Sequence, residues 1–454
     1  MINEIADMSK TIKAKWFTAD ISCEVGALLA GYGPNDVSTS KLDNLEANGL
    51  CVDDGANKVL VVALDLLGIN EEAIKPIRKR LADELGVPET NVMLTCTHTH
   101  SGPCTRWTIK RDAVAIKKMP ADPKYLAHLG DILAAEAAKL RDAEGWRECL
   151  IGYYSEYVDE NRNRRYTTAD NCTAAAEYRR KLLDINTGIA DKEFGTIALL
   201  EPNTMNPLYV IGNYAAHAIA CHAPGKAGYR ITADYPGFFR RYIREELGAG
   251  AMFVNGAAGD LVPKGNELGV DGARQTGVAL AKAAIGSVID IQRNATRFVI
   301  EEPKVGGLIR TMETPLISRW KKLLERDSVT LEVQCIHFGD VAFVGMPGET
   351  VCELGLEIKW HSPFRRTFIA YLATDYCGYI SPTSHVASGG YEPQDQRFVS
   401  RDTLRLVETA RDALYELRQK AFPEDYRDDD VYPDNLNLPL FNLPGGLKVS
   451  KWQN

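Results

Sequence analysis

Two histidines stand two residues apart at the end of an apolar run, in the segment NVMLTCTHTHSGPC. They are His98 and His100, in a chain of 454 residues that holds only 8 histidines. If the preceding strand continues through them, its period of two points both imidazoles to one face, where they could converge on one metal ion or substrate. Taken alone, the pattern is more typical of a solvated or hydrogen-bonded pair, so a metal site needs further ligands.

Two other segments contain residues that could complete a metal site. His217 ends an apolar run in GNYAAHAIACHAP, with His222 five residues later, and Glu349 follows a strand and a Pro-Gly turn in VAFVGMPGETV. Each has a simpler interpretation, because an isolated histidine is often only hydrogen-bonded and a carboxylate suits the first turn of a helix. Imidazole and carboxylate are nevertheless ordinary zinc ligands, and a catalytic zinc keeps one position for water.

The segments around these residues alternate between strand and helix patterns. A strand pattern at 58–69 precedes a helical one at 70–86, and the strand before the histidines precedes an Ala-rich helical pattern at 124–144. Further strands are expected in GTIALLE, LYVIGNYAAHA, AMFVNGAA, LEVQCIHFGDVAFVGMP and FIAYLATDY. The alternation predicts an α/β fold, with layered mixed β-sheets flanked by helices, in which ligands bind beyond the strand ends.

The pattern predicts one large domain over 1–420. No clear linker or repeat interrupts it. The remainder, 421–454, is rich in Pro, Asn and Asp, and we expect it to form an extended arm.

Amino-acid composition indicates which broad class of protein the chain belongs to. Hydrophobic residues make up 45% and charged residues 25%, as in soluble globular chains. The net charge of −8 opposes nucleic acid as a partner. The sequence contains neither a transmembrane segment nor a secretory signal, so we expect a cytoplasmic protein, or a secreted or periplasmic one if a signal was removed. The 10 cysteines have no CxxC spacing and are expected to be reduced; the oligomeric state stays open.

The order of short motifs resembles the N-terminal catalytic domain of the neutral/alkaline non-lysosomal ceramidases, zinc-dependent amidases that cleave the N-acyl bond of ceramide. The most specific match is THTHSGP at 97–103. In chain order there follow NRNRR at 161–165, NYAAH at 213–217, TADYPG at 232–237, GAAGDLVP at 256–263, MPGET at 346–350 and YCGYISPTSHVASGGYE at 376–392. The similarity covers about residues 16–420, and ITADYPG resembles bacterial members outside the true ceramidases.

The resemblance implies a zinc ion held by His98, His217, Glu349 and Tyr379. It places His100 at the reacting carbonyl, where an imidazole could stabilise the oxyanion or pass a proton to the leaving nitrogen. Tyrosine is an unusual zinc ligand. Its phenol could instead donate a hydrogen bond, which makes Tyr379 a catalytic candidate as well.

Four further residues complete the predicted pocket. Arg164, in NRNRR, resembles an arginine that could fix a substrate oxygen, with a surface arginine as the alternative. Asp260 is a catalytic candidate and Asp234 a substrate-binding one, although such aspartates are as often helix caps or turn residues. Val262 stands where the ceramidases have a serine before proline, so a contact made by that hydroxyl is lost. A metal-activated water could survive this change, whereas a serine nucleophile could not.

We therefore expect a ceramidase-like, zinc-dependent hydrolase that cleaves an N-acyl amide with a metal-activated water. The segment CTRWTIKRD after THTHSGP replaces a glycine of the ceramidases and brings bulk and charge to the pocket mouth. The expected substrate is a small-molecule or lipid-like amide other than ceramide itself. Two alternatives stay open: a metal-dependent esterase acting on a sugar or lipid derivative, and a non-catalytic descendant that binds a small molecule. Another first-row metal could replace zinc.

Overall fold

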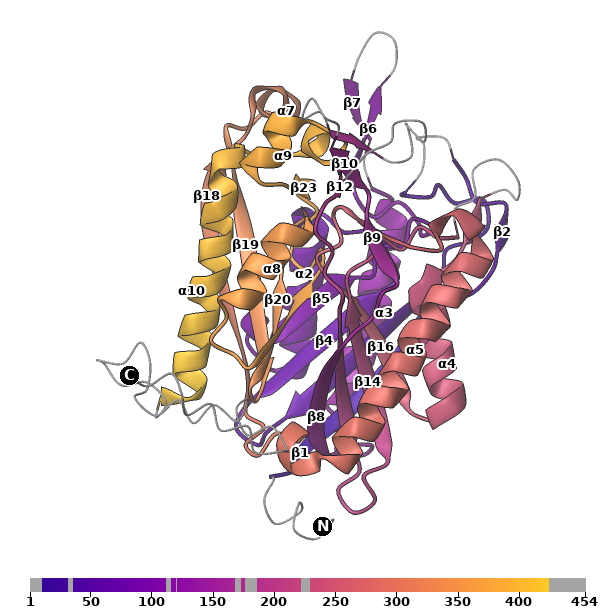
Figure 1. Ribbon diagram of the computed structural model, residues 1–454, viewed down its shortest axis with the longest axis vertical. Helices are drawn as coiled ribbons and strands as arrows, with labels where there is room; N and C mark the ends of the chain where they lie inside the picture. Colours follow the sequence, from indigo (N-terminus) through magenta and orange to yellow (C-terminus); the bar gives the residue numbers. More distant parts are fainter. Residues whose placement is uncertain are drawn as a thin grey trace.

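Two β-sheets pack face to face in the computed structural model, and helices cover the outer face of each sheet (Figure 1). The structure describes residues 10–31, 36–111, 116–119, 121–167, 173–175, 186–221 and 229–423. His222 and residues 424–454 of the predicted C-terminal arm lie outside these ranges.

The larger sheet has eight strands in the order β16-β14-β13-β8-β1-β3-β4-β5. Their bounds are β1 Ile12–Asp20, β3 Glu46–Asp53, β4 Lys58–Leu64, β5 Val92–Cys96, β8 Arg147–Tyr157, β13 Glu193–Leu200, β14 Pro207–Tyr214 and β16 Gly250–Asn255. The two outermost pairs run parallel and the inner pairs antiparallel. Both faces of the sheet are apolar: Val210 packs toward the helices and its neighbour Ile211 toward the second sheet.

The smaller sheet has the order β18-β19-β20-β22. Its strands are β18 Val305–Pro315, β19 Ser328–Phe338, β20 Val341–Gly345 and β22 Arg366–Ala370. Phe343 and Phe368 face the larger sheet, where they join a core that contains Met252 and Val254 of β16. Helices α8 (Cys352–Trp360) and α10 (Thr403–Ala421) cover the other face of the smaller sheet.

Four helices cover the outer face of the larger sheet: α2 (Glu71–Leu85), α3 (Pro123–Leu140), α4 (Asp234–Leu247) and α5 (Val270–Arg293). Local sequence sets their ends. Asp122 caps α3 by accepting the backbone N–H groups of Lys124 and Tyr125, and α2 stops at Gly86, which adopts a left-handed conformation with φ of +68°.

Shorter elements connect these layers. The helical turns are η1 Glu89–Asn91, η3 Asn266–Leu268, α6 Ala295–Phe298, α7 Ser318–Leu324, α9 Thr383–Ser388, η4 Glu392–Asp395 and η5 Ser400–Asp402. The short strands are β2 Ser40–Lys41, β6 Thr108–Arg111, β7 Ile116–Met119, β9 Asn161–Asn163, β10 Arg165–Thr167, β11 Thr173–Ala175, β12 Asn186–Thr187, β15 Arg230–Ile231, β17 Leu261–Pro263, β21 Glu349–Thr350 and β23 Tyr379–Ile380.

The predicted α/β layering is confirmed. The helical patterns at 70–86 and 124–144 correspond to α2 and α3, whereas the strand predicted at 58–69 already ends at Leu64. No helix within the described ranges is both long and apolar enough to cross a bilayer. The nine cysteines that the structure describes are all free thiols.

The two edge strands of the larger sheet end beside each other. β16 and β5 stand at opposite ends of the strand order, yet they are in contact. Asn255, the last residue of β16, donates its side-chain amide to the carbonyl of Thr97, at 3.0 Å, just after β5. Its own carbonyl accepts the N–H of Tyr371, at 3.0 Å, just after β22. The ends of three strands from both sheets therefore meet at one place.

A cluster of buried charges fixes helix α4 to this end of the larger sheet. Arg240 donates to both oxygens of the fully buried carboxylate of Asp65, and its Nε donates to Glu46, at 3.0 Å. Arg244, one turn later, donates to both oxygens of Glu46, at 2.8 and 2.9 Å. Burial alone would raise the pKa of Glu46, but the two arginines outweigh it and lower that pKa to about 2.

We expect the contribution of Glu46 to stability to disappear in acid. Its folded pKa, about 2, lies below the ordinary value of 4.5, so the ionised carboxylate stabilises the fold above pH 4.5, and this is lost as the pH falls through 2. Glu46→Gln should lower the free energy of unfolding by roughly 2 kcal/mol at pH 7. By pH 3 the deficit should be less than half of that.

Urea unfolding at several pH values measures this difference. Glu245→Gln, at an exposed position of the same helix, is the matched control and should change the free energy of unfolding by less than about 0.5 kcal/mol. A Glu46→Gln deficit that stays constant from pH 7 to pH 3 would contradict the assigned role.

Candidate active site

His98 lies on a left-handed turn directly after β5. The strand ends at Cys96, and His98 has a φ of +67°, a conformation that costs a non-glycine residue about 1 kcal/mol or more. Its N–H donates to the carbonyl of Leu66, at 3.0 Å, and its Nδ1 contacts the carbonyl of Leu67, at 2.7 Å. The strand therefore ends before the two histidines, and a period of two does not set the directions of their rings. The turn sets the direction of the His98 ring, and the hydrogen bond from the His98 N–H to the Leu66 carbonyl stabilises the turn.

His100 is held by two loops from elsewhere in the chain. Its N–H donates to the carbonyl of Ala218, at 3.2 Å, and its Nδ1 contacts the carbonyl of Gly31, at 2.9 Å. The approach requires a glycine, since a Cβ atom at position 31 would lie 2.1 Å from the Cβ of His100.

His217 follows β14 and is fully buried. Its N–H donates to the carbonyl of Leu261, at 2.9 Å, and its Nδ1 contacts the carbonyl of Ala258, at 2.6 Å. On the other side of the ring, Nε2 lies 3.2 Å from Oε2 of Glu349 but has no hydrogen-bond partner in the part of the chain that the structure describes.

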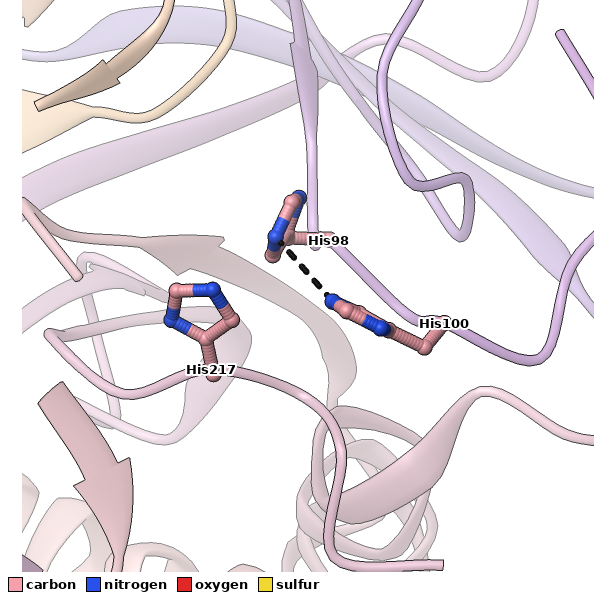
Figure 2. Close-up of side chains that lie close together, drawn as sticks. All are labelled: His98, His100 and His217. Carbon is pink, nitrogen blue, oxygen red and sulfur yellow. Dashed lines mark hydrogen bonds between the residues drawn. The ribbon is translucent and has the colours of Figure 1, made fainter. Parts of the chain in front are cut away.

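The three imidazoles all present Nε2 to a common centre (Figure 2). A carbonyl oxygen can only accept a hydrogen bond, so each Nδ1 carries the proton and each Nε2 carries a lone pair. Nε2 of His98 and Nε2 of His100 are 3.3 Å apart, and one donor atom from each of the three rings lies within 4.8 Å of the others. Lone pairs this close need a proton or a cation between them.

Glu349 adds a carboxylate to the same centre. It lies in β21 and is the direct parallel neighbour of Tyr379 in β23. Its Oε2 is 3.4 Å from Nε2 of His98 and accepts the hydroxyl of Tyr371, at 3.3 Å, while Oε1 accepts the hydroxyl of Tyr376. The carboxylate is thus oriented by two buried tyrosines.

The electrostatics of the centre suit a metal ion. Burial alone would raise the pKa of Glu349, but His98 and His217 outweigh it and hold that pKa well below its usual range. Burial, followed by the charge of Arg164, lowers the pKa of His217 to about 4, and burial lowers the pKa of His100 well below its usual value. The lowered pKa values of Glu349, His100 and His217 favour the deprotonated side chains that metal binding requires. The buried group His98, His100 and His217 can therefore hold a metal ion.

Arg164 is buried beside this centre, which excludes the alternative of a surface arginine. Its Nε donates to Glu392, at 2.8 Å, and its Nη2 donates to the carbonyl of Gly259 and to the hydroxyl of Tyr379, both at 2.9 Å. Burial raises the pKa of Tyr379 well above its usual value, so the phenol stays protonated. Arg164 thus contacts one of the predicted metal ligands directly.

The other predicted pocket residues have mainly backbone partners. Asp260 accepts the N–H of Cys352, at 2.8 Å, and the side chain of Asn163, at 2.7 Å. Asp234 begins α4 and accepts the N–H groups of Cys221 and Tyr235, both at 2.7 Å.

Val262 is buried in β17, next to Leu261, whose carbonyl accepts the N–H of His217. The strand that carries the valine therefore takes part in positioning one of the predicted metal ligands. The assignment of Asp234, Asp260 and Val262 to the substrate pocket stays a prediction.

The comparisons with known proteins identify the fold. No family model and no curated protein matches the sequence. Among solved structures, neutral ceramidase from Pseudomonas aeruginosa is similar with a TM-score of 0.69 and 16% identity, over 93% of this chain and 76% of that one. A ceramidase complexed with C2 also has a TM-score of 0.69, with 15% identity, over 90% of this chain and 76% of that one.

The chain has the ceramidase fold. The resemblance drawn from the order of motifs is thereby confirmed for the fold.

Several residues around the candidate site were not predicted from the sequence. Tyr376 and Glu392 lie inside the motif YCGYISPTSHVASGGYE, and Asn255 immediately precedes GAAGDLVP, so the motifs marked their neighbourhood but not their roles. For Tyr371 we find no sequence signal, since its hydroxyl reaches Glu349 only because β22 ends beside β16.

We expect about one metal ion per chain in protein purified without chelator, by elemental analysis. His98→Ala, His217→Ala and Glu349→Gln should each lose it, because each removes a converging lone pair or charge. His361→Ala, at an exposed histidine, is the matched control and should keep it. Retention of the full metal content by all three site variants would contradict a metal centre here.

Proposed function

We propose that this protein is a Zn2+-dependent hydrolase that cleaves an N-acyl amide bond by means of an activated water. The observation that carries the proposal is the convergence of three Nε2 lone pairs and an ionised carboxylate at one buried point of a ceramidase fold. The proposed ligands are His98, His217 and Glu349. Tyr379, the fourth ligand that the resemblance implies, is assigned to the substrate instead, and so is His100.

When bound, Zn2+ would lower the pKa of a water toward about 7 and polarise the substrate carbonyl. His100 is suited to the proton transfer, because Gly31 fixes its tautomer and leaves the lone pair of Nε2 facing the centre. We assign it the proton of the attacking water. As the water oxygen bonds to the carbonyl carbon and the C–N bond breaks, His100 returns this proton to the leaving nitrogen.

Tyr379 is suited to stabilise the developing oxyanion. Arg164 donates to its hydroxyl oxygen at 2.9 Å, so the hydroxyl hydrogen is left to donate elsewhere. The guanidinium is itself fixed by Glu392 and by the carbonyl of Gly259, and it therefore positions Tyr379 rather than contacting the substrate.

Removal of the Tyr379 hydroxyl should slow the reaction. Loss of one oxyanion donor costs about 10²–10³ in kcat, and we expect Tyr379→Phe to show this loss with little change in KM. The assay compares an N-acyl anilide with the phenyl ester of the same acyl chain. Tyr415→Phe, at an exposed tyrosine of α10, is the matched control. If the wild type hydrolyses the ester but not the anilide, the protein is an esterase rather than an amidase. If kcat is unchanged in Tyr379→Phe, the Tyr379 hydroxyl does not stabilise the oxyanion.

A substitution at Val262 distinguishes a metal-dependent mechanism from one that needs a serine at this position. Because the proposed mechanism uses no hydroxyl at this position, the wild type should be active, and Val262→Ser should change kcat/KM by less than about tenfold. If neither form is active and both bind amides tightly, the chain is a small-molecule-binding descendant instead. Activity that appears only in Val262→Ser would also contradict the proposed mechanism.

A further inference from the structure

Arg106 stacks on a tyrosine that belongs to the candidate active site. Its guanidinium carbon lies 4.3 Å from the centre of the Tyr376 ring, and the hydroxyl of the same ring donates to Oε1 of Glu349. One aromatic ring therefore separates the positive charge of Arg106 from the carboxylate at the predicted metal centre. An arginine face over an aromatic ring is a favourable arrangement that leaves its N–H edge available.

The backbone on both sides of Arg106 is anchored. The hydroxyl of Thr105 donates to the carbonyl of Gly68, and the N–H of Trp107 donates to the side chain of Asn70, both at 2.8 Å. Gly68 also lets the Tyr376 ring approach, since a Cβ atom there would lie 2.6 Å from the ring. The segment between β4 and α2 thus holds Arg106 and its tyrosine together, and the guanidinium needs little reorganisation to bind a ligand.

The charge of Arg106 is not neutralised by a direct partner in the described ranges. Its Nε is buried without a hydrogen-bond partner among the described residues, and its Nη1 makes a long contact, 3.5 Å, with the carbonyl of Trp107. Arg164 differs, because Glu392 binds it at 2.8 Å. Asp395 and Glu349 act on Arg106 only through space. A second guanidinium, that of Arg397, lies 5.3 Å from the same tyrosine ring and adds positive potential.

We propose that Arg106 binds an anionic group of the substrate. The substrate class is then an amide that carries a carboxylate or sulfonate within a few bonds of the scissile bond, as an N-acyl amino acid does. The inference rests on the proposed amidase function. A buried guanidinium without a partner is costly, and the planar fork of arginine matches a two-oxygen anion.

Matched amides test the charge preference. N-hexanoylglycine and N-hexanoyltaurine carry the anion on the amine side, N-butylsuccinamate carries it on the acyl side, and N-hexanoylethanolamine is neutral. We expect the wild type to prefer at least one anionic amide over the neutral one in kcat/KM. Arg106→Gln should lower kcat/KM for that amide by about 10- to 100-fold and for the neutral amide by less than about threefold. Arg106→Lys should recover part of the loss.

Equal losses on the charged and neutral amides in Arg106→Gln would overturn the assignment, and so would a wild type without charge preference. Arg141→Gln, at an exposed arginine, is the matched control. Melting temperature and metal content of each variant show whether it is folded and loaded.

A wild type that hydrolyses none of these amides would refute the proposed amidase and leave the Arg106 assignment to a binding measurement. Calorimetric titration of the metal-loaded protein with N-hexanoylglycine and N-hexanoylethanolamine then decides. Tighter binding of the anion, lost in Arg106→Gln, supports the assignment, and equal affinities overturn it.

Discussion

Asp65 is a fully buried carboxylate whose partners come from three separate parts of the chain. Arg240 of α4 binds both of its oxygens, Thr97 donates its hydroxyl at 3.1 Å, and the N–H of Glu46 donates at 2.8 Å. Removing Arg240 or Asp65 alone would leave the other charge buried without its partner, which costs several kcal/mol. The end of β4, helix α4 and the residue before His98 are therefore fixed relative to one another, and the left-handed turn at His98 starts from this fixed point.

Main-chain carbonyls, rather than acidic side chains, orient the imidazoles. His98, His100 and His217 each place Nδ1 against a backbone oxygen. The tautomer of each ring is consequently set by loop geometry, and the common direction of the Nε2 lone pairs is a property of the fold. Close to these loops, the hydrogen bonds of Asn255 join the ends of β5, β16 and β22. The strain at His98 is the local cost of aiming one ring into the shared centre.

The sequence predicted the layers correctly and the local geometry less well. Apolar periodicity identified α2, α3 and several strands because these patterns are local. It could not identify the turn at His98, which depends on the carbonyls of Leu66 and Leu67 in a neighbouring loop. The burial of Arg164 was equally invisible, since its carboxylate partner Glu392 is 228 residues away in the chain. Motif order marked where the site lies, but long-range packing decides which side chains face it.

The two sides of the candidate site are charged differently, and this bears on what it can accept. On one side, Glu392 binds both Arg164 and Arg165, so each guanidinium next to Tyr379 has a direct carboxylate partner. On the other side, the described residues give Arg106 no ion-pair partner within contact distance. If the proposed function holds, a neutral amide such as ceramide would give that guanidinium no ion-pair partner, whereas an anionic amide would supply one. Arg106 thus adds a positive charge beside the candidate metal centre without being one of its proposed ligands.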